Sequence, residues 1–288
     1  MSGAASRRKG GFLFVLPSLV ILGGFGILVS FSNIWFSLLD WTALSAPHFV
    51  LFSNYAHFFR DHVAIRSLLN TFEYAALYVV PTLVISLLVA VLLNRHTKVM
   101  LFYRTLFYIP VVTSYVIVIV VWQWFYDYNI GLFNQALALV GVAKVPWLLS
   151  PSLALPSLVL LSIWKNSGYT ILIFLAGLQT IDANLYDAAK IDGCGTYRLF
   201  FRITLPQLRP TTLLSIVMVT TWSFQMFVQP YLLTQGGPNY STSTIAYYLY
   251  VEAFSFYNVG YGSTIAVIGV AVFFIVITIE RRLFMVRG

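Results

Sequence analysis

Residues 182–210 read DANLYDAAKIDGCGTYRLFFRITLPQLRP, and they stand between two long apolar runs. A short helix is predicted to begin at Asp182, whose carboxylate can cap its N-terminus, and to continue to about Ile191. Gly193 and Gly195 follow, and glycine in this place ends a helix. The first half of the stretch therefore predicts one short helix with a defined end.

The second half of the stretch predicts another short helix. Thr196 can cap its N-terminus, and the apolar residues up to about Ile203 recur on one face. Pro206 is predicted to end this helix, because proline lacks the backbone N–H that a helix needs. Pro210 stands where the first turn of the next long helix begins.

The first helix presents small side chains beside acidic ones. Ala188 and Ala189 lie between Asp187 and Asp192. A small, partly charged helix suits insertion into a groove of another protein. A hairpin on the membrane surface with solvated charges is the alternative, and composition alone leaves both interpretations open.

The composition places most of the chain outside water. Of the 288 residues, 59% are hydrophobic and 9% are charged, whereas soluble domains have about 25% charged residues. The formal charge of +8 would suggest nucleic acid as a partner of a soluble protein, but here the basic residues cluster in short loops between apolar runs. Cys194 is the one cysteine, which excludes an internal disulfide and a cysteine-based zinc site.

Six apolar runs are each long enough to cross a bilayer, which needs about 20 residues per helix. The first run has a basic flank like that of a signal peptide, but it is too long and no small-residue cleavage site follows it. We therefore predict an all-α integral membrane protein with six transmembrane helices, in which residues 1–11 precede a single domain, 12–288. The predicted spans are residues 12–39, 69–93, 101–126, 153–178, 211–234 and 262–279.

The distribution of Lys and Arg predicts the orientation. If the N-terminus is cytoplasmic, thirteen basic residues lie in cytoplasmic segments and three lie in outer loops. Both termini are therefore predicted to be cytoplasmic, and so is loop 179–210 between the fourth and fifth spans. The cytoplasmic residues are Arg7, Arg8, Lys9, Arg95, Lys98, Arg104, Lys190, Arg198, Arg202, Arg209, Arg281, Arg282 and Arg287, and the outer ones are Arg60, Arg66 and Lys144.

The residue order in this loop closely resembles the EAA loop of ABC importer permeases. That loop has the pattern Glu-Ala-Ala, Asp-Gly-Ala, a phenylalanine and Ile-x-Leu-Pro-x-Leu-x-Pro. Asp187 replaces the usual Glu, which would weaken or redirect a salt bridge, and Cys194 replaces the usual Ala, with which it is nearly isosteric. The matching positions are Asp187, Ala188, Ala189, Asp192, Gly193, Cys194, Phe201 and residues 203–210 (ITLPQLRP).

The resemblance implies a coupling helix that docks on a separate ATP-hydrolysing subunit. It also implies a second permease subunit, two ATPase subunits and an extracytoplasmic substrate-binding protein, in a bacterial or archaeal cell membrane. The chain has no phosphate-binding loop of its own, so we expect it to bind no cofactor, with ATP and Mg used by the partner ATPase. The docking residues that the resemblance implies are Asp187, Ala188, Ala189, Asp192, Gly193, Leu205 and Pro206.

Other segments resemble the carbohydrate-uptake branch of this family, specifically the maltose-type first permease subunit. They are Asp40-Trp41, Asn54-Tyr55, the TQGGP segment at 234–238 and residues 247–260. The expected function is therefore that of a permease subunit for a sugar or oligosaccharide, with alternating access driven by ATP hydrolysis in another chain. Importers of glycerol phosphate or polyols share these features. A stand-alone secondary transporter is a second class, although no clear repeat links the two halves of the chain.

Polar residues inside apolar runs are costly and are candidates for function. In the resembling family the fourth and fifth spans line the transport cavity, and Asn166 and Ser223 match positions that contact substrate in the maltose-type subunit. The alternative is that amide side chains only join helices through hydrogen bonds. The candidates for the substrate pathway are Lys165, Asn166, Tyr169, Trp222, Ser223, Gln225 and Gln229.

Lys165 is a charge near the middle of a predicted span, so it should face water or a carboxylate. Glu73 is the acidic residue well inside a predicted span. We expect either a Lys165–Glu73 pair or a Lys165 that faces an anionic substrate, such as a sugar phosphate or uronate. The histidines lack metal-ligand spacing, and no nucleophile–base order is present, so the chain is not expected to be an enzyme.

Overall fold

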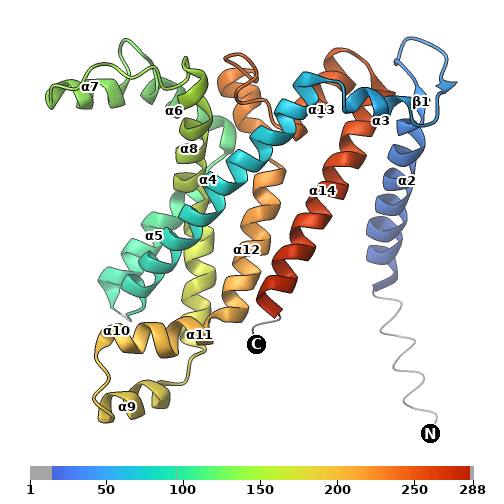
Figure 1. Cartoon of the computed structure of the whole chain (residues 1–288). Coiled ribbons are helices and arrows are strands. Elements are labelled where there is room, and N and C mark those ends of the chain that lie inside the picture. Colours follow the sequence, from blue (N-terminus) through green and yellow to red (C-terminus); the bar gives the residue numbers. More distant parts are fainter. Residues whose placement is uncertain (1–14, 96, 286–288) are drawn as a thin grey trace, which may run out of the picture. The chain divides into compact units, whose positions relative to one another are not determined.

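A computed structural model of the chain describes residues 15–95 and 97–285. These residues are mostly helical (Figure 1), because in lipid a helix satisfies its own backbone hydrogen bonds. The predicted segment 1–11, the start of the first predicted span and the basic residues Arg7, Arg8, Lys9 and Arg287 lie outside the described residues.

The chain divides into two compact units. The first comprises the described part of residues 1–62 together with Leu249–Val270. The second comprises Val63–Tyr248 together with the described residues from Ala271 onward. Long helices continue from one unit into the other, so each unit is described by itself.

In the first unit, side-chain hydrogen bonds hold the C-terminal end of the long apolar helix Val15–Ser37. Asn54 donates from Nδ2 to Leu39 O (2.8 Å) and to Ser37 O (3.1 Å). The Oη atom of Tyr55 lies 2.7 Å from Ser37 Oγ, so the Asn54-Tyr55 segment has a structural role here. The elements of this unit are η1 (Leu19–Phe25), α2 (Gly26–Ser37), the antiparallel pair β1 (Leu39–Asp40) and β2 (His48–Phe49), α3 (Ser53–Phe58), η4 (Val251–Ser255) and the first part of α14 (Val259–Met285).

The second unit holds the remaining helices. Its helical loop, α9 to α11, lies at the opposite end from α7 (Figure 1). Its elements are α4 (His62–Leu93), α5 (Lys98–Val112), α6 (Tyr115–Phe125), α7 (Leu132–Leu139), α8 (Pro151–Gln179), α9 (Ala183–Ile191), α10 (Thr196–Leu199), η2 (Phe200–Thr204), α11 (Leu205–Gln207), α12 (Arg209–Phe224), η3 (Pro230–Thr234), most of α13 (Ile245–Tyr250) and the last part of α14.

Four described helices are long and apolar enough to cross a membrane. They correspond to four predicted spans, although the first helix ends at Ser37, before the predicted end at residue 39. A fifth candidate is the pair α5 and α6, if these two helices form one span. The four helices are Val15–Ser37, His62–Leu93, Pro151–Gln179 and Val259–Leu283.

The prediction of one continuous helix over 101–126 is wrong. α5 ends at Val112, α6 begins at Tyr115, and the two helices meet at an angle of 97°. Thr113 and Ser114 between them have extended backbones, with ψ angles of 140° and 137°. Pro110, in the last turn of α5, cannot donate a backbone hydrogen bond, which weakens the helix just before the break.

The prediction of one continuous helix over 211–234 is also wrong. α12 ends at Phe224, residues 225–229 are not one regular helix, and η3 begins at Pro230. In a continuous helix the N–H of residue 230 would bond to Met226 O, but proline has no N–H. Thr244 Oγ1 donates to Met226 O instead (2.6 Å), so a residue far along the chain stabilises the break.

Apolar clusters join α4, α8 and α12 in the second unit. Each cluster consists of side chains that are almost fully buried, which supplies the packing that holds membrane helices together. The first contains Tyr74, Tyr78, Leu155, Leu158, Val159, Val219 and Met226. The second, further along α4, contains Ala90, Leu93, Ile171, Phe174, Leu175, Leu178 and Leu208.

The segment before α13 is anchored on α4 by polar contacts. Asn70 donates from Nδ2 to Tyr240 O (2.7 Å) and Ser243 O (2.8 Å). Ile245 N donates to Thr71 Oγ1 (2.9 Å). Because the side chains of Asn70 and Thr71 are fully buried, these bonds fix the backbone that follows the TQGGP turn.

α5 and α8 approach so closely that a glycine is needed between them. A Cβ atom on Gly168 would collide with Phe107 O and would lie 3.0 Å from Val111 Cγ2. The absence of a side chain at Gly168 therefore lets the two backbones meet just before the break that follows α5.

We expect Gly168→Ala to lower the free energy of unfolding by about 1–3 kcal/mol, the usual cost of forcing extra atoms into a packed contact. The measurement is the apparent melting temperature of the detergent-solubilised protein. Gly26→Ala is the control, because a Cβ there meets no described atom within 4 Å. Equal melting temperatures for the two variants would contradict this packing.

Candidate functional site

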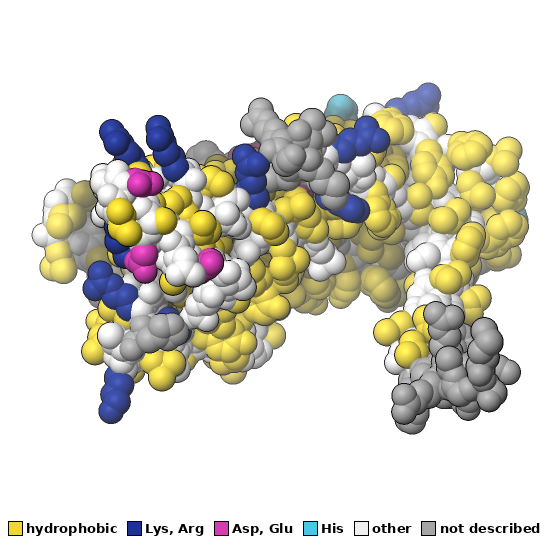
Figure 2. All heavy atoms as spheres, turned by 90° about the horizontal axis from the view of Figure 1, so that it is seen from below, with side chains coloured by type: hydrophobic (Ala, Val, Ile, Leu, Met, Phe, Trp, Pro, Cys, Tyr) yellow, Lys and Arg dark blue, Asp and Glu magenta, His cyan; other side chains and the backbone are white. Residues whose placement is uncertain are grey.

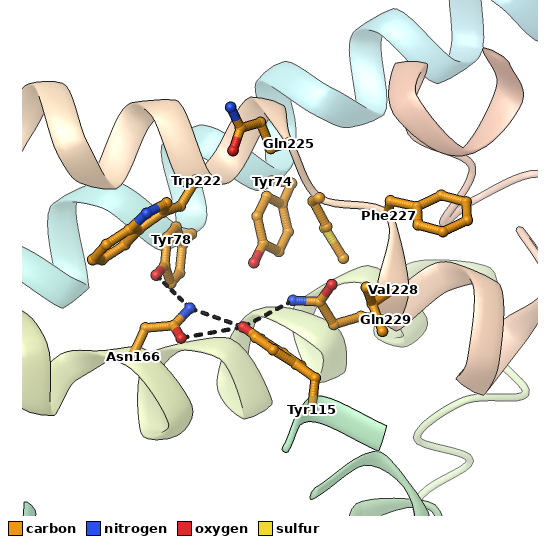
Figure 3. A pocket seen from close by; sticks show the side chains of 10 residues that line it. Tyr74, Tyr78, Tyr115, Asn166, Trp222, Gln225, Phe227, Val228 and Gln229 are labelled. Carbon is orange, nitrogen blue, oxygen red and sulfur yellow. Dashed lines mark hydrogen bonds between the residues drawn. The ribbon is translucent and has the colours of Figure 1, made fainter. Parts of the chain in front are cut away.

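A cavity of 210 Å³ lies among α4, α6, α8 and the segment after α12 in the second unit (Figure 3). Both helix breaks contribute to it, since Tyr115 is the first residue of α6 and residues 225–229 follow α12. The lining residues are Tyr74, Tyr78, Tyr115, Asn166, Trp222, Gln225, Met226, Phe227, Val228 and Gln229.

An amide on α8 is at the centre of a hydrogen-bond network in this cavity (Figure 3). Asn166 donates from Nδ2 to Tyr78 Oη (3.0 Å) and Tyr115 Oη (2.9 Å). Gln229 donates from Nε2 to Tyr115 Oη (3.3 Å) and to Ser162 Oγ (3.1 Å). The network therefore joins α4, α6, α8 and the segment after α12 through side chains alone.

Aromatic rings form much of the rest of the cavity wall, together with Met226 and Val228. Tyr74 and Tyr78 lie one turn apart on the same face of α4, and their rings stack at 5.3 Å and 17°. The rings of Trp222 and Tyr169 meet edge to face, with their centres 5.4 Å apart and an angle of 76° between their planes. Among the described lining residues the polar groups are amides and phenols, without a charged side chain. Such groups exchange hydrogen bonds with hydroxyls, while ring faces pack against apolar C–H surfaces.

The structure brings together four of the seven residues predicted for the substrate pathway. Asn166, Trp222, Gln225 and Gln229 line the cavity. Ser223 is fully buried and its Oγ donates back to Thr220 O (2.7 Å). It therefore does not reach the cavity.

The other two residues lie beside the cavity without lining it. Tyr169 supports Trp222 from outside. Lys165 donates from Nζ to Val111 O (2.8 Å), and Nζ lies 4.9 Å from the centre of the Tyr115 ring. The predicted Lys165–Glu73 pair is wrong, because Lys165 turns toward α5 and α6, whereas Glu73 is exposed.

The sequence analysis missed the three tyrosines of the cavity. Tyr74 and Tyr78 carried a usable signal, since two hydroxyl-bearing rings four residues apart share a helix face. Tyr115 carried none, because its position depends on the break between α5 and α6.

A second cavity, of 510 Å³, borders the turn formed by the TQGGP segment. Thr234, Gly237 and Pro238 line it together with Asp127 and other residues. Gln235 and Gly236 adopt the left-handed backbone (φ 49° and 78°) that makes the turn. The backbone N–H groups of Ile130 and Asn129 donate to Asp127 Oδ1 and hold the pKa of this carboxyl below its usual value.

The helical loop from α9 to α11, at the opposite end of the second unit from α7, begins as predicted. Asp182 Oδ1 accepts a hydrogen bond from Asn184 N (2.9 Å) at the start of α9. Gly193 has a φ of 75° and follows the end of α9, as expected for a glycine stop. The predicted end of the second helix at Pro206 is wrong. Pro206 lies in the first turn of α11, where its missing N–H costs nothing, so the helical path continues.

The predicted docking residues fall on two parts of this loop. On α9, Asp187 and Ala188 are exposed and Ala189 is buried, and the exposed Asp192 follows the end of the helix. Asp187 forms an exposed ion pair with Lys190 (3.0 Å). Figure 2 shows acidic and hydrophobic side chains of this end with Lys and Arg side chains around them. Leu205 and Pro206 border a cavity of 370 Å³ with Phe201, Arg209 and Thr212.

The described residues contain no group of three or more His, Cys, Asp or Glu side chains placed to hold a metal ion.

Comparison with known sequences gives a family match over most of the chain. The family described as "Binding-protein-dependent transport system inner membrane component" matches residues 76–285. The sulfoquinovosyl glycerol transport system permease protein of Agrobacterium fabrum is 35% identical over 269 residues, covering 93% of this chain and 86% of that protein. The trehalose/maltose transport system permease protein of Thermococcus litoralis is 33% identical over 266 residues, covering 91% and 89%.

Comparison with solved structures gives the same fold. A chain of a bacterial ABC transporter involved in the import of the acidic polysaccharide alginate superposes with a TM-score of 0.81 at 21% identity, covering 97% of this chain and 96% of that one. The alginate transporter in complex with an alginate pentasaccharide-bound periplasmic protein gives a TM-score of 0.79 at 20% identity, covering 96% and 94%.

Within the loop, one side-chain contact fixes α9, because Tyr186 Oη lies 3.0 Å from Thr204 Oγ1. We expect Tyr186→Phe to speed amide hydrogen exchange in α9 about fivefold, since one hydrogen bond contributes about 1 kcal/mol. Exchange measured by mass spectrometry on the detergent-solubilised protein tests this. Tyr197→Phe is the matched control, because Tyr197 is 80% exposed. The same acceleration in both variants would mean that it does not come from the contact between Tyr186 and Thr204.

Proposed function

The chain belongs to the family of binding-protein-dependent transport system inner membrane components, the multi-pass permeases of ABC transporters, and from this premise we propose its place in an importer. It is one of two permease subunits that together form the translocation pathway for a sugar or oligosaccharide. The residues 12–288 act as one permease domain, and transport proceeds by alternating access driven by ATP hydrolysis in another subunit.

The membrane topology in this proposal has six crossings. The helices α2, α4, α8 and α14 each cross once, and each broken pair crosses once, α5 with α6 and α12 with η3. In the second unit, α4 ends, α12 begins and α14 ends on the same side as α9 (Figure 1). The basic residues of these segments favour a cytoplasmic location for that side, which puts both termini in the cytoplasm.

The loop from α9 to α11 is the part that docks on the ATPase. An exposed small face at Ala188 beside Asp187 and Asp192 suits insertion into a groove, and Leu205 and Pro206 border the adjacent cavity. ATP and Mg are used in the ATPase subunits, and this chain binds no cofactor. On the outer side, the TQGGP turn faces an extracytoplasmic substrate-binding protein.

The observation that carries the substrate proposal is the set of groups around the 210 Å³ cavity. Amide groups of Asn166, Gln225 and Gln229 with tyrosine hydroxyls and aromatic faces match the hydroxyls and C–H faces of a sugar. The names of two relatives, the permease proteins of Agrobacterium fabrum and Thermococcus litoralis, concern sugar transport, which supports this class. A polyol is the second candidate, because it offers hydroxyls without the C–H face of a ring.

We expect Ala188→Arg to remove the ATPase from the complex, because a charge forced into a docking groove is left without a partner. A tagged chain is purified from native membranes in mild detergent, and its co-purifying subunits are quantified by mass spectrometry. The expected loss of ATPase is at least about tenfold, the equivalent of about 1.4 kcal/mol.

Ala136→Arg is the matched control for this experiment. Ala136 is an exposed alanine on α7, at the opposite end of the second unit. Full recovery of the ATPase with Ala188→Arg would contradict the docking role. Recovery of the unmutated chain alone would contradict the importer and favour a self-sufficient transporter.

We expect Asn166→Leu to lower kcat/KM for sugar uptake about tenfold, since the substitution removes the central amide at similar volume and each hydrogen bond contributes about 0.5–1.5 kcal/mol. The measurement is uptake of labelled sugars, starting with trehalose and maltose, by proteoliposomes with the full complex and its binding protein. Asn33→Leu on α2 is the control, because Asn33 Nδ2 donates to Val29 O of its own helix (3.1 Å). Unchanged uptake in Asn166→Leu would show that the sugar does not use this cavity.

A further inference from the structure

A lysine inside the second unit faces a helix end and not the cavity. The Lys165 side chain is 3% exposed. Its Nζ donates to Val111 O at 2.8 Å, and the same atom lies 4.9 Å from the centre of the Tyr115 ring. Lys165 therefore touches the last turn of α5 and the first residue of α6, on both sides of the break.

The end of α5 leaves carbonyl oxygens that need partners, because the last four carbonyls of a helix have none within it. Thr113 satisfies two of them, with its N–H on Pro110 O (3.3 Å) and its Oγ1 on Ile109 O (2.9 Å). Val111 O is the next in order, and its partner is Lys165. The ammonium group also lies at the negative end of the α5 dipole, where a cation is stabilised.

The position of Tyr115 follows from this contact. Tyr115 begins α6, so the angle between α5 and α6 decides where its ring lies. The Lys165 ammonium holds one face of that ring through a cation–π contact. The Tyr115 hydroxyl in turn accepts from both Asn166 and Gln229 in the cavity.

We infer that Lys165 is a positioning residue. Its ammonium group caps the C-terminal end of α5 and holds Tyr115 in the cavity. It does not bind the charged group of an anionic substrate. This inference rests on the proposed function, since it assigns Lys165 a role in a sugar pathway. It explains why a buried lysine has no carboxylate beside it in the described structure, because a helix end and an aromatic face take the place of the counter-ion.

The first test measures uptake by proteoliposomes that contain the full complex and its binding protein. The probes are the neutral sugars trehalose and maltose and, as an acidic sugar, alginate oligosaccharides. We expect Lys165→Met to lower kcat/KM about tenfold for every probe that the unmutated complex transports. Lys165→Arg should stay within about threefold of the unmutated complex, because a guanidinium can also donate to Val111 O and stack on Tyr115.

A double-mutant cycle separates positioning from an independent role. If Lys165 acts through Tyr115, the double variant Lys165→Met, Tyr115→Phe should lose no more kcat/KM for uptake than the more damaging single variant. A loss in the double variant that equals the product of the two single losses would overturn the inference. So would an unchanged uptake in Lys165→Met, or a loss confined to the acidic sugar, which would mean direct contact with substrate charge.

A labelling experiment measures how accessible the break between α5 and α6 is, without any substrate. Ser114→Cys places a thiol in the exposed break, in a background in which the one native cysteine is removed by Cys194→Ala. We expect Lys165→Met to raise the rate of maleimide labelling at this position at least threefold. An unchanged rate would overturn the inference.

Lys144→Met is the matched control for both experiments. Lys144 also donates to a carbonyl, Asn129 O (3.3 Å), and lies 5.6 Å from the ring centre of Tyr128, but it is exposed. It should change neither uptake nor labelling. If the unmutated complex takes up no sugar, the proposed function fails, while the labelling rates still decide the role of Lys165.

Discussion

In a membrane protein, a backbone carbonyl that has no hydrogen-bond partner within its own helix needs one elsewhere. The structure of the second unit depends on the partners of two such carbonyls. Val111 O, at the end of α5, accepts from Lys165. Met226 O, after α12, accepts from Thr244. In both places the partner comes from a different helix or segment, so the breaks are stable only in the folded unit. Non-helical backbone in a membrane protein is tolerated where it is enclosed by protein or lines a cavity, and residues of both breaks line the 210 Å³ cavity.

The cavity is a direct consequence of these breaks. A continuous third span would carry the residue at position 115 past α8 on a straight axis, whereas the 97° bend turns Tyr115 toward Asn166. After the interruption at Phe224, Gln225 and Gln229 both line this cavity. The hydrogen bonds from Asn166 and Gln229 to Tyr115 then join the broken segments to α8. Under the proposed function, the amide and phenol groups that hold these segments together would also contact the substrate.

Much of this arrangement follows from local sequence, and the part that does not is explained by distant contacts. The four long helices and the start of α9 at Asp182 were predictable, because hydropathy and capping depend on neighbouring residues. Pro230 was visible as a possible interruption, but its effect depends on Thr244, and nothing in the sequence links the two. The turn of Ser223 back onto its own helix, and not toward the cavity, depends on where α12 ends. The docking and substrate roles of the predicted residues stay predictions.

The helical loop and the cavity are joined by the two helices that flank the loop. α8 carries Asn166 and ends at Gln179, just before the loop, and α12 starts at Arg209, just after it. The 16 residues of α12 span about 24 Å at 1.5 Å per residue, and the segment that lines the cavity begins at its far end. A Cβ atom on Gly177 would collide with Thr211, so α8 and α12 are in close contact beside the loop. Under the proposed function, a displacement of α9 would therefore act on both helices, and α12 would transmit it to the segment that lines the cavity.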